Sequence, residues 1–225
     1  MSSGALLVDF GGTLDADGDP WVERFFRGYR EVGGAADRPE FGTAFARSDV
    51  QLAQLPGITT FDYSTTVTAQ VDLLAALLPD GARLRSGPLR ASFVAAAQAA
   101  AARNRSVLLA LSADYRLAVV SNYQGNLQPC LDELGLGDVF DVVADSEVVG
   151  ARKPGRRIFE ATLAALGSVA EACWMVGDSP PNDIAPAAAL GMRTCWLAPA
   201  ARVAVGITPT ARVARFDQLP HVLAA

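Results

Sequence analysis

The sequence predicts an α/β protein: a Rossmann-like parallel sheet core flanked by helices, with an inserted all-helical cap domain. Apolar runs with the length of buried strands alternate with helical segments at the start of the chain and again after residue 103. This alternation is typical of a parallel sheet covered by helices. The residues between have helical hydrophobic spacing and no convincing strand. We therefore expect a core domain over residues 1–16 and 103–225 and a cap domain over residues 17–102.

Each core element is predicted by a short local pattern. Apolar runs predict buried strands over residues 5–9, 117–120, 139–144, 173–176, 194–197 and 211–216. Helical spacing predicts helices over residues 127–134, 156–166 and 183–190. Gly135 and Gly191 would end two of these helices. Asp17-Gly18 is a turn signal, which favours a small flap or hairpin over residues 14–20.

The expected cap contains three recognisable helical segments. Aromatic residues indicate the first, at Phe25, Phe26 and Tyr29. A second apolar face recurs at helical spacing and consists of Val67, Val71, Leu74 and Leu78. Ser64 is the expected N-cap of this helix, and Pro79-Asp80-Gly81 would end it. The alanine-rich stretch 93–102 predicts a further helix, because alanine is the strongest helix former.

Composition narrows the possible classes of function. Hydrophobic residues make up 51% of the 225 residues, but no apolar run is long enough to span a membrane. No signal segment is recognisable, so a cytoplasmic location is expected. The net charge is −5 without a basic cluster, which argues against nucleic acid or a membrane surface as partner. The three cysteines are expected to be free, buried thiols, and no pattern indicates the oligomeric state.

Polar residues that could carry chemistry follow the expected strands. They are Asp9, Ser121, Asn122, Lys153, Asp178 and Asp183. In a parallel sheet such positions converge on one crevice. Lys153 is the only lysine and His221 the only histidine, so a histidine base or a multi-histidine metal site is nearly excluded.

The chemistry of such a crevice is that of phosphoryl transfer. A carboxylate can attack phosphorus directly and form an aspartyl-phosphate. A phosphate beside several carboxylates requires a divalent cation, and Mg²⁺ suits oxygen ligands. A lysine would neutralise the remaining charge, and hydroxyl or backbone N–H groups at Thr13 and Ser121 can hold phosphate oxygens. A small phosphorylated molecule is therefore the expected substrate.

The order and spacing of these residues resemble the four motifs of the haloacid dehalogenase (HAD) superfamily. The first motif, Asp-x-Asp-Gly-Thr-Leu, corresponds to residues 9–14, and the fourth to Gly177-Asp178 followed by Asp183. Ser121 and Lys153 match the second and third motifs. The helical insert lies where the family places its C1 cap, between the first and second motifs.

The resemblance implies a role for each matched residue. Asp9 would be the nucleophile and a Mg²⁺ ligand, with the backbone carbonyl of Gly11 in the second metal position. Asp178 would be a metal ligand and Asp183 a supporting acid at the metal site. The resemblance implies that Ser121 and Lys153 bind the substrate. Thr13 and Asn122 are expected to bind it as well, because they stand next to the matched positions at the strand ends.

The first motif departs from the family at Gly11, where phosphatases carry an acid/base aspartate. One interpretation is a phosphatase in which water or another acid carries the proton to the leaving group, or in which the leaving group needs no proton. Asp15 and Asp17 are candidates to replace the missing acid, although both could simply be turn formers. A second is a metal-independent 2-haloacid dehalogenase, since halide leaves without a proton; the retained Asp178 favours Mg²⁺ and phosphate instead. A phosphonatase would need a cap lysine, which this cap lacks. A fourth reading is a protein that binds a phosphorylated ligand or a partner without turnover.

Cap residues are expected to select the substrate. Four arginines could recognise an anionic substrate tail or could simply be solvated: Arg24, Arg27, Arg30 and Arg47. Trp21, near the expected hinge, would either line the entrance or pack inside the cap. We expect, in sum, a Mg²⁺-dependent hydrolase whose proton carrier the sequence does not identify.

Overall fold

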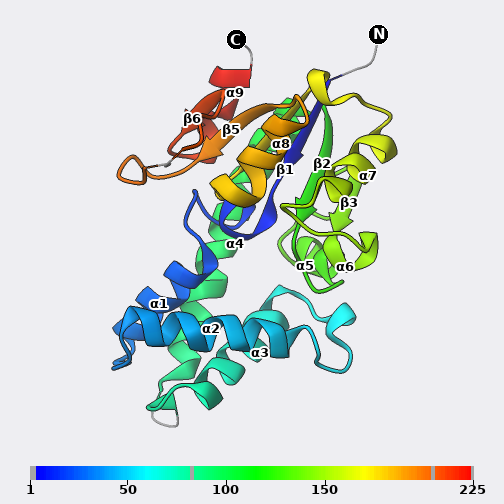
Figure 1. Ribbon diagram of the computed structural model, residues 1–225. Helices are drawn as coiled ribbons and strands as arrows, with labels where there is room; N and C mark the ends of the chain where they lie inside the picture. Colours follow the sequence, from blue (N-terminus) through cyan, green and yellow to red (C-terminus); the bar gives the residue numbers. More distant parts are fainter. Residues whose placement is uncertain (1–3, 82–83, 204–205, 224–225) are drawn as a thin grey trace.

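A six-stranded parallel sheet forms the centre of the structure, a computed structural model that describes residues 4–81, 84–203 and 206–223 (Figure 1). The strands are β1 (Ala5–Val8), β2 (Arg116–Ser121), β3 (Val142–Asp145), β4 (Cys173–Gly177), β5 (Arg193–Leu197) and β6 (Ala211–Val213). Their order is β3-β2-β1-β4-β5-β6, and every neighbouring pair is parallel. The predicted α/β core is confirmed.

The strand order places one candidate residue at the centre of the sheet. The chain runs outward from β1 through β2 and β3, then returns to the other side of β1 for β4, β5 and β6. Val8 at the end of β1 pairs with Val119 of β2 and Val176 of β4. Asp9 therefore follows β1 at the point where the strand order reverses, which is where open α/β sheets bind ligands.

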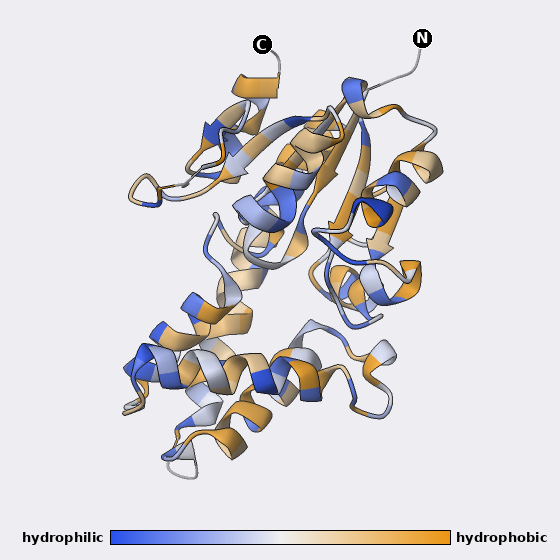
Figure 2. Cartoon of the chain, in the orientation of Figure 1, coloured by the Kyte–Doolittle hydropathy of each residue, from blue (hydrophilic) through white to orange (hydrophobic). Residues whose placement is uncertain are grey.

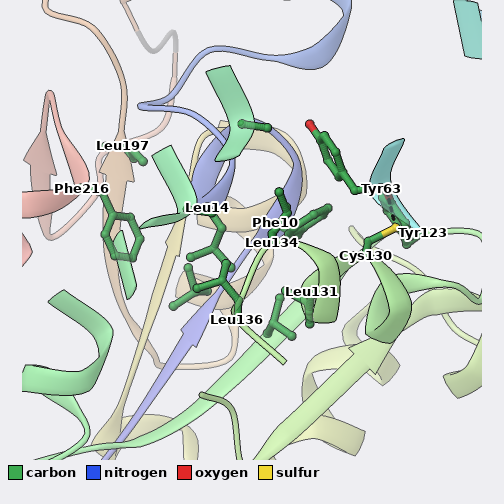
Figure 3. Packing of buried hydrophobic residues seen from close by; sticks show 14 of the residues in the cluster. Phe10, Leu14, Tyr63, Tyr123, Cys130, Leu131, Leu134, Leu136, Leu197 and Phe216 are labelled. Carbon is green, nitrogen blue, oxygen red and sulfur yellow. Dashed lines mark hydrogen bonds between the residues drawn. The ribbon is translucent and has the colours of Figure 1, made fainter. Parts of the chain in front are cut away.

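The sheet is covered on both faces, so β1 is apolar throughout, as a doubly buried strand requires. Leu6 and Val8 belong to a large apolar cluster that continues into the cap. Ala5 and Leu7 point to the opposite face and pack in a second cluster. Hydrophobic residues concentrate along the central strands (Figure 2). Figure 3 shows the tight packing of the larger cluster around Phe10.

Five helices of the described chain flank the sheet. They are α5 (Leu127–Glu133), α6 (Ser146–Val149), α7 (Arg156–Leu166), α8 (Ala185–Ala189) and α9 (Leu219–Leu223). The prediction for α7 matches to the residue, because its amphipathic pattern ends at Gly167, which adopts a left-handed conformation. The expected strand over 139–144 begins only at Val142, and that over 211–216 ends at Val213. The three cysteines are free and buried, as expected.

The cap is helical, as predicted, and lies beyond the carboxyl ends of the strands (Figure 1). Its helices are α1 (Trp21–Glu31), α2 (Arg38–Leu52), α3 (Tyr63–Leu77) and α4 (Ser86–Leu111). The N-cap prediction for α3 was wrong: Asp62 accepts the capping hydrogen bond, from the backbone of Thr65. Ser64 instead donates its backbone N–H to Glu133 of α5, 2.7 Å away, and so ties the cap to the core.

Helix α4 connects the two parts of the molecule. Its N-terminal half packs in the cap through Leu89 and Phe93, and its C-terminal half reaches the core through Leu108 and Leu111. The expected boundary between residues 102 and 103 falls inside this 26-residue helix. The division into domains stays a prediction.

Residues 15–20 form turns and bends rather than a hairpin. No described helix has the length and apolar character needed to cross a membrane.

Candidate active site

A cavity of about 290 Å³ opens at the carboxyl ends of β1, β2 and β4, between core and cap. Its core side is formed by Asp9, Gly11, Ser121, Asn122, Tyr123, Gln124, Lys153, Asp178, Ser179, Asn182, Asp183 and Arg202. Its cap side is formed by Pro20, Trp21, Phe45 and Asp49. Every residue expected at the site therefore lines this cavity except Thr13.

The Lys153 ammonium group lies at the buried floor of the cavity. It donates to Asp9 Oδ1 and Asp183 Oδ1, each at 2.6 Å, and to the carbonyl of Val120 at 2.9 Å. Burial lowers the pKa of Lys153, but the carboxylates of Asp183 and Asp9 raise it more, so the pKa lies above its ordinary value. The lysine is therefore a fixed positive charge beside the proposed nucleophile.

Asp9 is held by two donors on different oxygens. Lys153 binds Oδ1, and the hydroxyl of Thr13 donates to Oδ2 at 3.0 Å. Burial is the main cause that raises the pKa of Asp9 to about 6, with Lys153 lowering it and Asp183 raising it. Asp9 is mostly ionised at neutral pH, as a carboxylate nucleophile must be.

Three buried carboxylates form a candidate metal site. Asp9, Asp178 and Asp183 each offer an oxygen, and these oxygens lie within 4.8 Å of one another. Burial, then the neighbouring charges of Asp9 and Asp183, raise the pKa of Asp178 well above its usual range. An all-oxygen set with surplus negative charge fits Mg²⁺.

The loops around the carboxylates are held close together. Gly12 has a φ of +89°, and a Cβ there would lie only 3.1 Å from Cγ of Asp178, so glycine is required. The Trp196 indole donates to the carbonyl of Asp178 at 3.0 Å, and the backbone N–H of Ser179 donates to Asp183 at 3.0 Å. The carboxylates are thus positioned before any ligand binds.

Asn122 and Thr13 position the reacting groups. The Asn122 side-chain amide accepts a hydrogen bond from the backbone N–H of Lys153 at 2.8 Å and donates one to the backbone carbonyl of Lys153 at 2.9 Å. Thr13 is fully buried and does not line the cavity; its hydroxyl orients Asp9. Ser121 and Asn122 face the cavity, where their expected contacts with substrate stay predictions.

The Trp21 indole lies beside Gly11, the position at which the first motif lacks a carboxyl. A Cβ built on Gly11 would lie 3.3 Å from Nε1 of Trp21 and 3.5 Å from its Cδ1. Trp21 was expected either to line the entrance or to pack inside the cap. It does both, since it lines the cavity and packs against cap aromatic residues.

Neither candidate substitute for the missing acid lines the cavity. Asp15 is buried and accepts hydrogen bonds from the Gly12 N–H, the Trp21 indole, the Arg24 guanidinium and the Tyr63 hydroxyl. Asp17 accepts from Arg103 and from the backbone of Phe216. Both residues hold the chain together between core and cap. Asp15 touches the cavity lining only from behind, through the Trp21 indole, so neither carboxyl faces the cavity.

None of the four cap arginines considered, Arg24, Arg27, Arg30 and Arg47, lines the cavity. Arg24 pairs with Asp15 inside the cap junction, Arg27 pairs with Asp19, and Arg30 donates to a backbone carbonyl. The arginine that does line the cavity, Arg202, follows β5 and was missed. Its guanidinium lies 3.5 Å from Asp178 and donates to the carbonyl of Gly18. Its position after a strand, at the ligand-binding edge, is the signal that could have identified it.

Comparison with known proteins agrees with this geometry. The family model for the haloacid dehalogenase-like hydrolase matches residues 4–191. The chain therefore belongs to the haloacid dehalogenase-like hydrolase family, and it is a hydrolase with the helical cap expected from the sequence.

Relatives with described activities match part of the chain. It is 34% identical over 121 residues to pyrimidine 5'-nucleotidase YjjG of Escherichia coli K12, covering 52% of this chain and 54% of that protein. It is 38% identical over 82 residues to the phosphoserine phosphatase of Thermus thermophilus, covering 36% of this chain and 33% of that protein. The chain thus spans only a third to about half of these two relatives.

Solved structures with the same fold cover the whole chain. The HAD-hydrolase YfnB from Bacillus subtilis, bound to magnesium, superposes with a TM-score of 0.61 at 20% identity over 100% of both chains. The 2-haloacid dehalogenase from Pseudomonas syringae pv. Tomato DC3000 gives 0.57 at 22% identity over 99% of this chain and 98% of that one. These likenesses establish the fold.

Proposed function

We propose that this protein is a Mg²⁺-dependent hydrolase of small phosphorylated metabolites, in which Asp9 forms an aspartyl-phosphate. The observation that carries the proposal is the buried group of Asp9, Asp178 and Asp183 beside Lys153, at the floor of a cavity. At about 290 Å³ the cavity is near the lower end of small-molecule sites, which span roughly 300–1,000 Å³.

The residues divide the work as follows. Asp9, which is oriented by Thr13, attacks phosphorus, and Lys153 balances charge on the transferring group. Asp9, Asp178, Asp183 and the backbone of Gly11 would hold Mg²⁺, which supplies further charge neutralisation when bound. Ser121 and Asn122 would bind phosphoryl oxygens from the β2 side of the cavity. The phosphatase and nucleotidase activities named for the relatives support a phosphorylated substrate.

The direct test measures orthophosphate release from phosphate monoesters and acyl phosphates with and without Mg²⁺. Activity should require the cation, and chelation should abolish it. Asp9→Asn should also abolish it, because the amide cannot act as the nucleophile. Asp19→Asn is the matched control, since Asp19 lies outside the cavity in an ion pair with Arg27. Phosphate release by Asp9→Asn at the wild-type rate would refute the mechanism.

A metal-independent C–X hydrolase is the second candidate, favoured by the absence of a carboxyl at Gly11. Halide leaves without a proton, so such an enzyme needs the nucleophile but no acid/base at that position. Chloride or bromide release from 2-haloacids in the presence of a chelator would establish this reaction in place of the first. Tight binding of a phosphorylated ligand without turnover in either assay would instead identify a binding protein.

A further inference from the structure

Trp21 occupies the space into which a side chain at position 11 would project. The Gly11 backbone has φ −73° and ψ 116°, which any residue can adopt. The three atoms nearest to an added Cβ all belong to the indole, with Nε1 at 3.3 Å, Cδ1 at 3.5 Å and Cε2 at 3.8 Å. A bulky aromatic group therefore lies directly beside the position where the first motif lacks a carboxyl, and a side chain there would have to pack against it.

The indole is fixed in this place and cannot act as an acid. Its N–H donates to Asp15 at 2.7 Å, and the same carboxylate oxygen also accepts from Arg24 and Tyr63. Four rings pack edge-on against it, at centroid distances of 5.4–6.3 Å, from Phe25, Tyr63, Phe93 and Tyr123. The wall beside Gly11 is thus rigid and apolar.

We propose that Trp21 makes the site selective for phosphoryl donors whose leaving group departs as an anion without a proton, such as acyl phosphates and aryl phosphates. The inference rests on the proposed phosphatase function. As the bond between Asp9 and phosphorus forms, the bond to the leaving oxygen breaks, and the carboxylate or aryloxide keeps the electron pair. Water then attacks phosphorus and the bond from phosphorus to the Asp9 oxygen breaks, so the Asp9 carboxylate is regenerated, orthophosphate is released and the proton of water passes to solvent.

The apolar wall suits the planar, apolar part of these leaving groups in shape. Trp21 and Phe45 face the cavity from the cap, and Tyr123 faces it from the core. A planar carboxylate or aryl ring can pack against such surfaces, whereas an alkoxide would need a proton that this wall cannot donate.

Asp49 is the carboxyl of the described cavity lining that has no ion pair with Lys153 or Arg202, which makes it the competing candidate for a general acid. It extends from α2, and the Gln124 side chain donates to it at 3.3 Å. The other lining carboxylates already have places beside Lys153 or Arg202. A role of Asp49 as general acid would contradict the proposal, so the test includes it.

The test compares kcat/KM, with Mg²⁺, for acetyl phosphate, 4-nitrophenyl phosphate, phenyl phosphate and glycerol phosphate. Wild-type kcat/KM should fall steeply as the leaving group becomes more basic, because a positioned acid normally contributes ~10²–10⁴ in rate. Gly11→Asp/Trp21→Phe restores a carboxyl and removes the nitrogen that crowds it. This variant should raise the ratio of kcat/KM for glycerol phosphate to kcat/KM for acetyl phosphate about tenfold or more, at the low end of that range, whatever happens to the absolute rates.

The matched control is Gly11→Asn/Trp21→Phe, which has the same shape but no acid and should keep the steep dependence. The wild-type series alone tests the inference if the double variants fail to fold. Similar wild-type kcat/KM for alkyl and aryl esters would overturn it, as would a selective loss of glycerol phosphate turnover in Asp49→Asn. No phosphate release from any compound would overturn the proposed function itself, and the inference with it.

Discussion

Replacing Asp15 should destabilise the protein strongly, although Asp15 lies outside the cavity. Its carboxylate is fully buried and pairs with the Arg24 guanidinium at 2.7 Å, whose side chain is 7% exposed. Burial lowers the pKa of Arg24, but Asp15, with smaller contributions from Tyr63 and Asp19, raises it above its ordinary value, so the guanidinium stays charged. Asp15→Asn would leave that charge buried without its partner.

Breaking a buried ion pair from one side costs about 3–5 kcal/mol. We therefore expect Asp15→Asn to lower the free energy of unfolding by about that amount, with the remaining hydrogen bonds of the amide limiting any larger effect. Urea denaturation followed by circular dichroism measures it. Asp19→Asn is the matched control, because it breaks an exposed pair with Arg27 and should cost about 0–1 kcal/mol.

A double substitution separates the lost charge from the lost contacts. Asp15→Asn/Arg24→Met removes both charges, so it should be less destabilised than the sum of the two single variants. A loss below about 1 kcal/mol in Asp15→Asn would place Asp15 among surface carboxylates and refute the reasoning from burial. Additive effects in the double variant would show that the two residues do not stabilise each other.

Three further predictions concern the site itself. Lys153→Met should reduce kcat/KM by about 100-fold or more, as measured by phosphate release, since it removes the charge that touches both Asp9 and Asp183; a comparable activity would contradict that role. The pKa of Asp9, raised to about 6, predicts that kcat/KM falls as the pH drops through that value, because protonation removes the nucleophile; a profile flat from pH 7 to 5 at subsaturating Mg²⁺ would contradict this. Mg²⁺ at about 100 times its Kd should stabilise the fold by about 2.7 kcal/mol in thermal unfolding, and Asp178→Asn should weaken this response; equal responses in both proteins would exclude Asp178 as a ligand.

The predictions from the sequence agree best with the structure where a local pattern of residues is enough to specify an element. The amphipathic run ending at Gly167 specifies α7 without help from the rest of the chain. Asp9 and Asp178 were predictable because polar residues at the ends of parallel strands must meet at one edge. Lys153 lies beyond β3 and α6, and it was predictable because it is the only lysine and matches the third motif. Arg202 lies in the loop after β5 and was missed, because it is one of many arginines and belongs to no motif.

The residues that the sequence misassigned are those whose partners are distant along the chain. Asp15 looks like a turn former, yet it binds Tyr63, which is 48 positions away. Ser64 looks like a cap, yet it binds Glu133 of α5, because Asp62 already caps α3. Buried hydrogen bonds of this kind are satisfied by whatever the tertiary fold brings near, and local propensity does not encode them.

The sequence by itself determined the parallel core, the helical insert and the group formed by Asp9, Lys153 and Asp178, because strand ends and motif spacing converge on one crevice. It also showed that Gly11 removes a carboxyl. Only the tertiary structure decided what replaces it: α1 brings Trp21 over Gly11, and Asp15 fixes the indole there. The physical reason is packing, since the space beside a glycine is filled by whichever side chain the fold delivers.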